Sequence, residues 1–179
     1  MDIQIEDFSL RRFRKQFCEF NSAVRDNRAH LIPYFWWARE NGFVRFKFIL
    51  SGILAEYIAR VSHELPYNKK FIIRSDGKFA GIIGLDDVAQ NAPRAEVWCF
   101  VTDESKRRHI ASTALKWVEN FARMKSIDKI YARTSRDNRQ SQYLLCRNGY
   151  NHYYPTDDNR KYRNQLMWYK YLNDKIIEK

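Results

Sequence analysis

Ala95-Glu96-Val97-Trp98-Cys99-Phe100-Val101 is followed by a polar turn, Thr102–His109, and then by Ile110–Ala122, and this stretch decides the fold. Its first part is apolar, aromatic or β-branched except for Glu96, a pattern typical of a buried strand. Its last part repeats apolar residues at helical spacing, which predicts an amphipathic helix. The chain is therefore expected to be organised around a strand, a polar turn and a helix.

Three adjacent cations, Lys106, Arg107 and Arg108, lie in the turn where the helix is expected to begin. The first N–H groups of a helix have no intrahelical acceptor, and the helix dipole adds partial positive charge at that end. Such a helix start binds anions, phosphate groups in particular. The turn therefore predicts a site for a phosphate-bearing ligand.

The sequence of this turn, KRRHIA over residues 106–111, resembles the signature Gln/Arg-x-x-Gly-x-Gly/Ala of the GNAT acetyltransferase superfamily. The resemblance implies that main-chain N–H groups of the turn hold the pyrophosphate of acetyl-CoA. His109 stands where the family has glycine, which lets the backbone approach a ligand and adopt a positive φ at little cost. A side chain there is expected to narrow the phosphate site or to change the path of the chain. The implied cofactor-binding residues are Lys106, Arg107, Arg108, His109, Ile110, Ala111 and Ser112.

A second motif, NRQSQYLLCRNGY at Asn138–Tyr150, resembles the other GNAT signature, Asn-x-x-Ser/Ala with an apolar pair and Gly-Phe/Tyr. From the residues alone, Asp137 or Asn138 caps a short helix and Gly149 ends it in the left-handed conformation. The resemblance implies that Asn138 and the start of this helix, Ser141 included, contact the pantetheine arm of acetyl-CoA. Every anchor position of this signature is filled at the right spacing.

The segment Asn27–Trp37 gathers aromatic residues around a proline. From the residues alone it is a short helix and an aromatic loop, whose simplest role is core packing. It is similar to Asn-Arg-x-x-Leu-x-x-Trp-Leu-x-Trp of the Rim-type ribosomal-protein N-terminal acetyltransferases, a GNAT branch, with Tyr34 at the first Trp position and Trp37 at the last. The resemblance implies that the segment borders the acceptor amine, with Tyr34, Trp36 and Trp37 as substrate-binding residues.

The remaining patterns predict helices over residues 8–24 and 45–60, a hairpin turning at Asp76-Gly77, a second turn at 90–93, a helix over 108–125 and strands over 129–134 and 164–170. A charged loop, 156–163, precedes the last strand. A strand–helix–strand unit normally pairs its strands in parallel. The resemblance implies the α+β GNAT fold over residues 1–179 as a single domain: a mixed, mostly antiparallel twisted sheet flanked by helices, with splayed central parallel strands.

The composition excludes a disordered chain, because 45% of the residues are hydrophobic and 16% are aromatic. No apolar run is long enough to span a membrane, and the N-terminus lacks the layout of a signal peptide. Three widely spaced cysteines suggest reduced thiols, hence a cytoplasmic protein, and no Cys/His cluster predicts a metal site. The net charge of +11 favours RNA, the ribosome, an acidic protein or a CoA-type ligand as partner, with solubility as the alternative explanation.

Acetylation of an amine requires a base for the acceptor's proton and donors that polarise the thioester carbonyl. Glu96 is the one charged residue of its apolar strand, where burial disfavours the charged form, so it is a candidate general base acting through a water. Its alternative interpretation is a structural ion pair with Arg94 or a position at the edge of the strand. Main-chain N–H groups of Phe100 and Val101 are candidates for polarising the carbonyl.

The departing thiolate also needs a hydrogen-bond donor. Many GNAT members carry a tyrosine at the position of Leu145, and it is missing here. The resemblance to Rim-type members implies that Ser141 donates to the CoA sulfur instead; the alternative is a hydroxyl that bonds the backbone at the helix start. Cys99 and Cys146 are expected to be buried packing residues, since no histidine is placed to activate them.

Together the resemblances imply an acetyl-CoA-dependent N-acetyltransferase that works by direct transfer. Its acceptor is a primary amine, on a protein N-terminus or on a small molecule. The competing hypothesis is a GNAT-fold protein that has lost acetyl transfer and serves as a basic binding module for RNA or an acidic protein. His109 and the missing tyrosine favour that alternative. No membrane association is expected, and the oligomeric state is predicted to be a monomer or a homodimer.

Overall fold

The computed structural model describes residues 1–62, 69–86, 93–153 and 164–173. They contain a seven-stranded sheet in the order β1-β2-β3-β4-β5-β7-β6. Its neighbouring strands are antiparallel except for β4 and β5, which confirms the predicted mixed, mostly antiparallel sheet. The strands are β1 (Ile3–Asp7), β2 (Lys69–Ser75), β3 (Lys78–Asp86), β4 (Arg94–Val101), β5 (Lys129–Ser135), β6 (Asn151–Tyr153) and β7 (Gln165–Tyr171).

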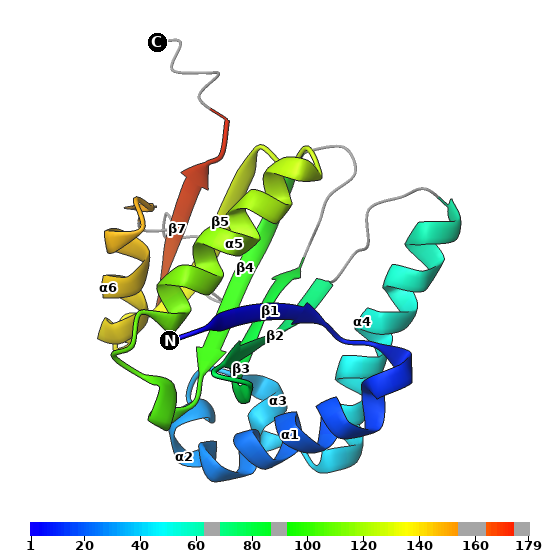
Figure 1. The fold of residues 1–179 in the computed structure, drawn as a ribbon. Helices are drawn as coiled ribbons and strands as arrows, with labels where there is room; N and C mark the ends of the chain where they lie inside the picture. The colour runs from blue at the N-terminus through cyan, green and yellow to red at the C-terminus, as the bar shows by residue number, and fades with distance from the viewer. Residues whose placement is uncertain (63–68, 87–92, 154–163, 174–179) are drawn as a thin grey trace.

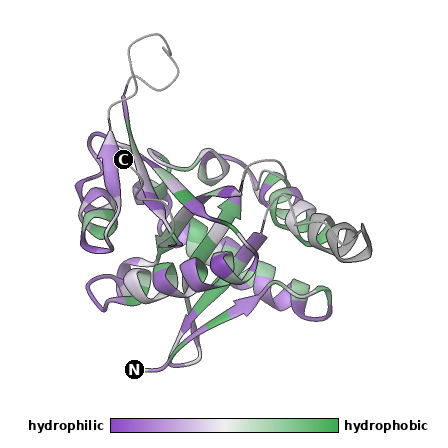
Figure 2. Cartoon of the chain, turned by 90° about the horizontal axis from the view of Figure 1, so that it is seen from above, coloured by the Kyte–Doolittle hydropathy of each residue, from purple (hydrophilic) through white to green (hydrophobic). Residues whose placement is uncertain are grey.

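Helices cover both faces of the sheet. Figure 1 shows α5 crossing in front of the central strands, with α1 to α4 grouped below and to the right. One apolar core lies between the sheet and α5 with α6, and a second lies between the sheet and α1 to α4. In Figure 2, α5 carries both green and purple, as expected of an amphipathic helix. The helices are α1 (Phe13–Asp26), α2 (Arg28–Leu31), α3 (Trp36–Arg39), α4 (Gly42–Ser62), α5 (Ile110–Met124) and α6 (Arg139–Arg147), with 3-10 turns at Leu10–Arg12 and Asp103–Ser105.

The parallel pair of β4 and β5 is short. Its register ends at Glu96↔Tyr131. Beyond this point β5 stays paired with β7, and β4 stays paired with β3 as far as Val101. The two strands therefore part at the centre of the sheet, which confirms the predicted splayed pair and creates the space in which the candidate site lies.

The N-terminal half of the sheet contains one confirmed prediction and one omission. Asp76 and Gly77 both have positive φ values, 50° and 75°, as a tight hairpin turn between β2 and β3 requires. β1 was not predicted, because an alternation as short as Ile3 and Ile5 is a weak signal among charged residues. It pairs with β2, and Ile5 lies opposite Ile73.

Two of the predicted helices begin at other residues than the sequence pattern predicts. The helix predicted from Phe8 begins as a 3-10 turn and becomes α1 at Phe13. α4 begins before Arg45, because the Asn41 side chain caps it and accepts the N–H groups of Phe43 and Val44, each at 3.0 Å. The predicted turn at 90–92 and the charged loop 156–163 lie outside the described residues. None of the helices that the structure describes has the length and apolar character that a membrane span requires.

Candidate active site

The turn before α5 has the backbone of an anion site. Arg107 and His109 both adopt left-handed conformations, with φ of 61° and 58°. The first helical hydrogen bond runs from Thr113 N–H to the His109 carbonyl at 3.0 Å. The N–H groups of Ile110, Ala111 and Ser112 therefore have no acceptor within the helix. Left-handed residues ahead of such amides form a concave group of donors, which fits the phosphates of a CoA-type ligand.

The cations of this turn are partly compensated by carboxylates. Lys106 pairs with Asp103, and Arg108 pairs with Asp76 of the β2–β3 hairpin at 3.0 Å. Arg107 is exposed, and the described residues include no carboxylate that pairs with it. Two of the three cations are thus already paired, whereas the first backbone N–H groups of α5 have no acceptor within the helix. These N–H groups are therefore the main donors that the turn offers to a phosphate.

His109 does not fill the central cavity. Its side chain is exposed, and it is absent from the residues that line that cavity. The left-handed φ of His109 explains why glycine suits this position, since a β-carbon costs about 1–2 kcal/mol in that conformation. His109 therefore adopts the left-handed backbone conformation that suits glycine, at an energetic cost.

A cavity of about 400 Å³ lies where β4 and β5 part. Six of the predicted site residues line it: Tyr34, Trp36, Trp37, Glu96, Asn138 and Ser141. The predicted phosphate turn, Lys106–Ser112, and Phe100 and Val101 do not line it. The structure thus groups the predicted acceptor and catalytic residues in one cavity and places the phosphate turn outside that cavity, at the start of α5.

Glu96 forms an ion pair, as its alternative interpretation expected, but the partner is Arg133 of β5 and not Arg94. Arg133 Nε donates to Glu96 Oε1 at 2.7 Å, and Arg133 Nη2 donates to Oε2. Both residues lie on the same face, just where the parallel pairing of their strands ends. Arg94 is at the exposed start of β4. The ion pair therefore bridges the two strands at the inner end of the opening and fixes both oxygens of Glu96.

The register of β4 distinguishes the two predicted carbonyl-polarising amides. Thr102 N–H donates to the Ala80 carbonyl at 2.9 Å, on the β3 side. Because successive N–H groups of a strand alternate in direction, Phe100 N–H also points to β3, and Val101 N–H points to the opening. Val101 therefore remains available as a donor to a ligand between the strands.

Ser141 lies in the first turn of α6, and its main-chain N–H donates to the Asn138 side chain at 3.1 Å. Asn138 is therefore the N-cap, which confirms one of the two predicted alternatives. Gly149 follows the helix in the predicted left-handed conformation, with φ of 79°. Leu145, at the position of the missing tyrosine, is buried and lines the cavity. Tyr143 is 64% exposed, so it does not replace that tyrosine.

The cysteines follow the predictions only in part. Cys99 lines the cavity, and burial raises the pKa of its thiol to about 12. It is therefore a thiol rather than a nucleophilic thiolate at neutral pH. Cys146 is exposed, so the prediction that it is buried is wrong: α6 presents that position to solvent. The described residues contain no group of His, Cys, Asp and Glu arranged to hold a metal ion.

Sequence reasoning missed Asp86, Trp98 and Phe48 as lining residues of the cavity. Asp86 is the last residue of β3 and lies directly opposite Glu96 in the β3–β4 register. A carboxylate at the end of an apolar strand was the available signal. The sequence predicts β3 but not its register against β4, so it could not show that Asp86 lies close to Glu96.

Comparison with known proteins places this geometry in a family. The sequence profile of the acetyltransferase (GNAT) family matches residues 14–150. No curated protein sequence matches the chain. A RimL ribosomal L7/L12 α-N-protein acetyltransferase in complex with coenzyme A has a similar structure, with a TM-score of 0.77 at 15% identity over 94% of this chain and 93% of the other.

Two further solved structures have similar folds. RimJ of Mycobacterium smegmatis, in complex with a CoA disulfide, gives a TM-score of 0.72 at 18% identity over 94% of this chain and 81% of the other. The microcin C7 self-immunity acetyltransferase MccE, in complex with acetyl-CoA and AMP, gives 0.76 at 15% identity over 95% and 92%. The profile match covers more than half of the chain, and the splayed sheet and unpaired α5 amides agree with it. The chain belongs to the GNAT acetyltransferase family.

Proposed function

We propose that this acetyltransferase moves the acetyl group of acetyl-CoA to the α-amino group of a protein N-terminus. The observation that carries the proposal is the cavity between β4 and β5, which has the aromatic segment at Tyr34–Trp37 on one side and Asn138 with Ser141 on another. The names of the RimL structures support a protein N-terminus as acceptor. A small-molecule amine is the alternative acceptor.

The residues of the chain fit a bound acetyl-CoA. The N–H groups of Ile110 to Ser112 are placed to donate to the pyrophosphate, with Arg107 as an accompanying cation. Asn138 and Ser141 at the start of α6 line the cavity and are proposed to contact the pantetheine arm. Bound acetyl-CoA supplies the activated acetyl group, and the Val101 N–H is proposed to polarise its carbonyl.

Glu96 is proposed as the general base and Ser141 as the donor to the thiolate. Each oxygen of Glu96 accepts one bond from Arg133 and keeps a second lone pair, which leaves room for a water that relays the acceptor's proton. Ser141 lines the same cavity and donates its hydroxyl proton in a hydrogen bond, without full proton transfer. The competing binding-module hypothesis predicts that the wild-type protein has no acetyl-transfer turnover.

Replacement of Glu96 by Gln is the test of this function. We expect kcat for a peptide acceptor to fall about 10²- to 10⁴-fold, because the relayed proton has no base, while the Kd of acetyl-CoA stays the same. Glu104→Gln, an exposed carboxylate beside the turn, is the matched control. Isothermal titration of the wild-type protein with millimolar acetyl-CoA that gives no heat would remove the enzyme hypothesis altogether.

Replacement of His109 by Gly is expected to tighten acetyl-CoA binding several-fold, because glycine adopts the observed φ without strain and lets the backbone approach the phosphates. Isothermal titration measures the change in Kd. Ser126→Gly is the matched control, since Ser126 has nearly the same φ, 57°, at the other end of α5. An affinity that is unchanged or weaker in His109→Gly would mean that the site is adapted to histidine.

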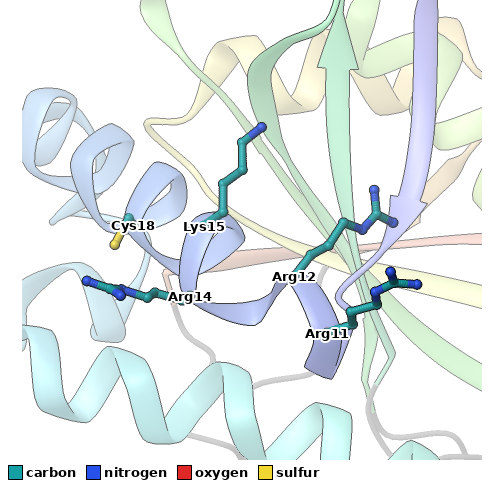
Figure 3. Close-up of a pocket in the computed structure, with 5 residues that line it drawn as sticks. All are labelled: Arg11, Arg12, Arg14, Lys15 and Cys18. Atoms are coloured by element: carbon teal, nitrogen blue, oxygen red, sulfur yellow. The ribbon is translucent and has the colours of Figure 1, made fainter.

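We further propose that the chain associates with RNA, through a basic cluster at the start of α1. Four cations line a shallow hollow there, Arg11, Arg12, Arg14 and Lys15, and their side chains fan out in Figure 3. Arg12 pairs with Glu6 at 3.0 Å, whereas the described residues offer no carboxylate partner to the other three. Spread cations suit the repeated phosphates of an RNA strand better than a single anion.

The double charge reversal Arg14→Glu/Lys15→Glu is expected to weaken RNA binding and to flatten its dependence on salt, by roughly 0.7–0.9 in logarithmic slope for each phosphate that is no longer neutralised. Fluorescence titration at two salt concentrations measures both effects. Lys116→Glu/Lys125→Glu on α5 changes the net charge equally and is the control. Equal weakening by both pairs would assign the binding to net charge alone. We also propose a cytoplasmic location, which the three widely spaced cysteines support.

A further inference from the structure

Two carboxylates enter the cavity from neighbouring strands. Asp86 of β3 and Glu96 of β4 are cross-strand partners, so their side chains leave the sheet on the same face. Both line the cavity. β-Carbons of such partners lie about 5 Å apart. The pocket thus contains a second acid beside Glu96, the proposed general base.

The two carboxylates are held differently. Arg133 donates to both oxygens of Glu96. The Nε1–H of Trp98 donates to Asp86 Oδ2 at 2.8 Å. The Trp98 indole lies against Gly84, where even a β-carbon would come within 2.5 Å of the ring, and this close packing fixes the indole. Trp98 therefore orients the Asp86 carboxylate from inside the pocket.

Aromatic rings surround this pair of acids. Phe48 lies between Trp36, Trp37 and Trp98, with ring centroids at 5.7, 5.9 and 6.0 Å. Trp36 is 59% exposed at the edge of this cluster, whereas Trp37 is buried. Faces of aromatic rings attract cations, and they do so more strongly where water is excluded. The walls therefore suit a positively charged group.

The chain itself already places an ammonium group beside this cluster. The Lys70 ammonium lies 4.5 Å from the centroid of the Phe48 ring, and its residue is only 6% exposed. Burial lowers the pKa of Lys70, and the charge of Asp86 opposes that shift. Asp86 thus acts favourably on the charge of an ammonium group at this end of β3. An acceptor that enters the cavity as an ammonium ion brings the same chemical group to the same carboxylate.

We propose that Asp86 binds the ammonium group of the acceptor and determines the selectivity of the pocket for a charged amine. This inference rests on the proposed acetyl transfer and adds to it the residue that determines selectivity for the charged form of the acceptor amine. Asp86 binds and aligns the incoming cation against the rings of Trp36 and Trp98. Glu96 keeps its proposed role as the base.

The acceptor enters as R–NH₃⁺, held by Asp86, and gives one proton through water to Glu96. The amine nitrogen then forms a bond to the acetyl carbon while the carbon–sulfur bond breaks. A second proton leaves the nitrogen and ends on the CoA sulfur, and the third stays on the amide product. Glu96 returns its proton to solvent, and Asp86 is unchanged at the end.

The test compares Asp86→Asn with the wild-type protein on two peptides that differ only in their terminal group. One carries an α-amino group, and the other an aminooxy group, which is uncharged at neutral pH. We expect KM for the amino peptide to rise at least 10-fold in the variant, and KM for the aminooxy peptide and the Kd of acetyl-CoA to change little. A merely structural role would raise both KM values alike, and that result would overturn the proposal.

Two further variants complete the experiment. Trp98→Phe removes the Nε1–H that orients Asp86, and we expect a smaller rise in KM and a partial loss of the preference for the charged peptide. It replaces Asp86→Asn if that variant does not fold. Asp26→Asn, on the exposed end of α1, is the control. If the wild-type protein acetylates no amine, the proposed function fails; if it does so and neither pocket variant alters the amino-to-aminooxy ratio, only this inference fails.

Discussion

Replacement of Lys170 by Met is expected to lower the free energy of unfolding by about 3 kcal/mol, the low end of the cost of breaking a buried ion pair. The Lys170 ammonium donates to Glu119 Oε2 at 2.7 Å and to the Asn148 carbonyl at 2.8 Å. Glu119 is 3% exposed on the inner face of α5. Without Lys170 its charge would stay buried with no cation beside it.

Within the described residues, Lys170 is the cation that pairs with Glu119. Its other oxygen, Oε1, has no hydrogen-bond partner within the described part of the chain, and neither has the Tyr150 hydroxyl. Burial raises the pKa of Tyr150, and the nearby Glu119 charge raises it further. Lys170 is thus the group that compensates this charge, and its loss would affect the contact of α5 with β7.

Urea unfolding followed by circular dichroism measures the effect. Lys116→Met, on the exposed face of α5, is the control and is expected to stay within about 0.5 kcal/mol of the wild-type protein. The double variant Lys170→Met/Glu119→Leu is expected to recover most of the loss, because an apolar pair leaves no buried charge. A single variant as stable as the wild type would show that water already solvates Glu119.

The same network connects stability to the cofactor site. Ser112, in the first turn of α5, donates to the Asn148 side chain at 2.8 Å. At the C-terminal end of α6 the Asn148 side-chain amide donates to the Leu144 carbonyl at 2.7 Å. The Asn148 main-chain carbonyl accepts from the Lys170 ammonium. The two helices whose starts are proposed to hold acetyl-CoA are therefore tied to each other behind the site. The Ser112 hydroxyl is used in this contact, which leaves its main-chain N–H for the phosphates.

The parts of the fold that sequence predicted well depend on local chemistry. The Asp76–Gly77 turn needs two positive φ values, and Gly149 needs one, so each residue identifies its own conformation. The strand before α5 and the apolar face of that helix follow from periodicity alone. The start of α6 was predicted because Asn138 caps it through a contact only three residues away.

The parts that could not be predicted depend on register. The alternative interpretation of Glu96 paired it with Arg94, its neighbour but one in the chain, yet Arg133 reaches it from a strand that is 37 residues away. Asp86 was missed for the same reason, since its position opposite Glu96 requires the pairing of β3 with β4. A charged residue in an otherwise apolar strand can be recognised from the sequence as a candidate functional residue. Which residues it contacts depends on the register between strands, which the sequence pattern does not give.

Replacement of Gly81 by Ala is expected to cost at least about 3 kcal/mol of stability, because the new methyl group has no space between β3 and β4. A β-carbon at Gly81 would lie 2.2 Å from the Phe100 carbonyl oxygen and 2.9 Å from the Val101 α-carbon. Both contacts are with backbone, so the strands must separate. Because Val101 ends the strand before the phosphate turn, the Kd of acetyl-CoA is expected to rise as well.

Gly84→Ala on the same strand is the matched comparison. There the three atoms nearest to a β-carbon all belong to the Trp98 indole, at 2.5–2.7 Å, and a side chain can move where a backbone cannot. We expect a smaller loss of stability, a higher KM for the acceptor and an unchanged Kd for acetyl-CoA. Urea unfolding and isothermal titration separate the two variants. The prediction assumes that the close packing of β3 against β4 positions the end of β4 beside the opening. A Gly81→Ala variant that unfolded like the wild type and bound acetyl-CoA equally well would contradict that assumption.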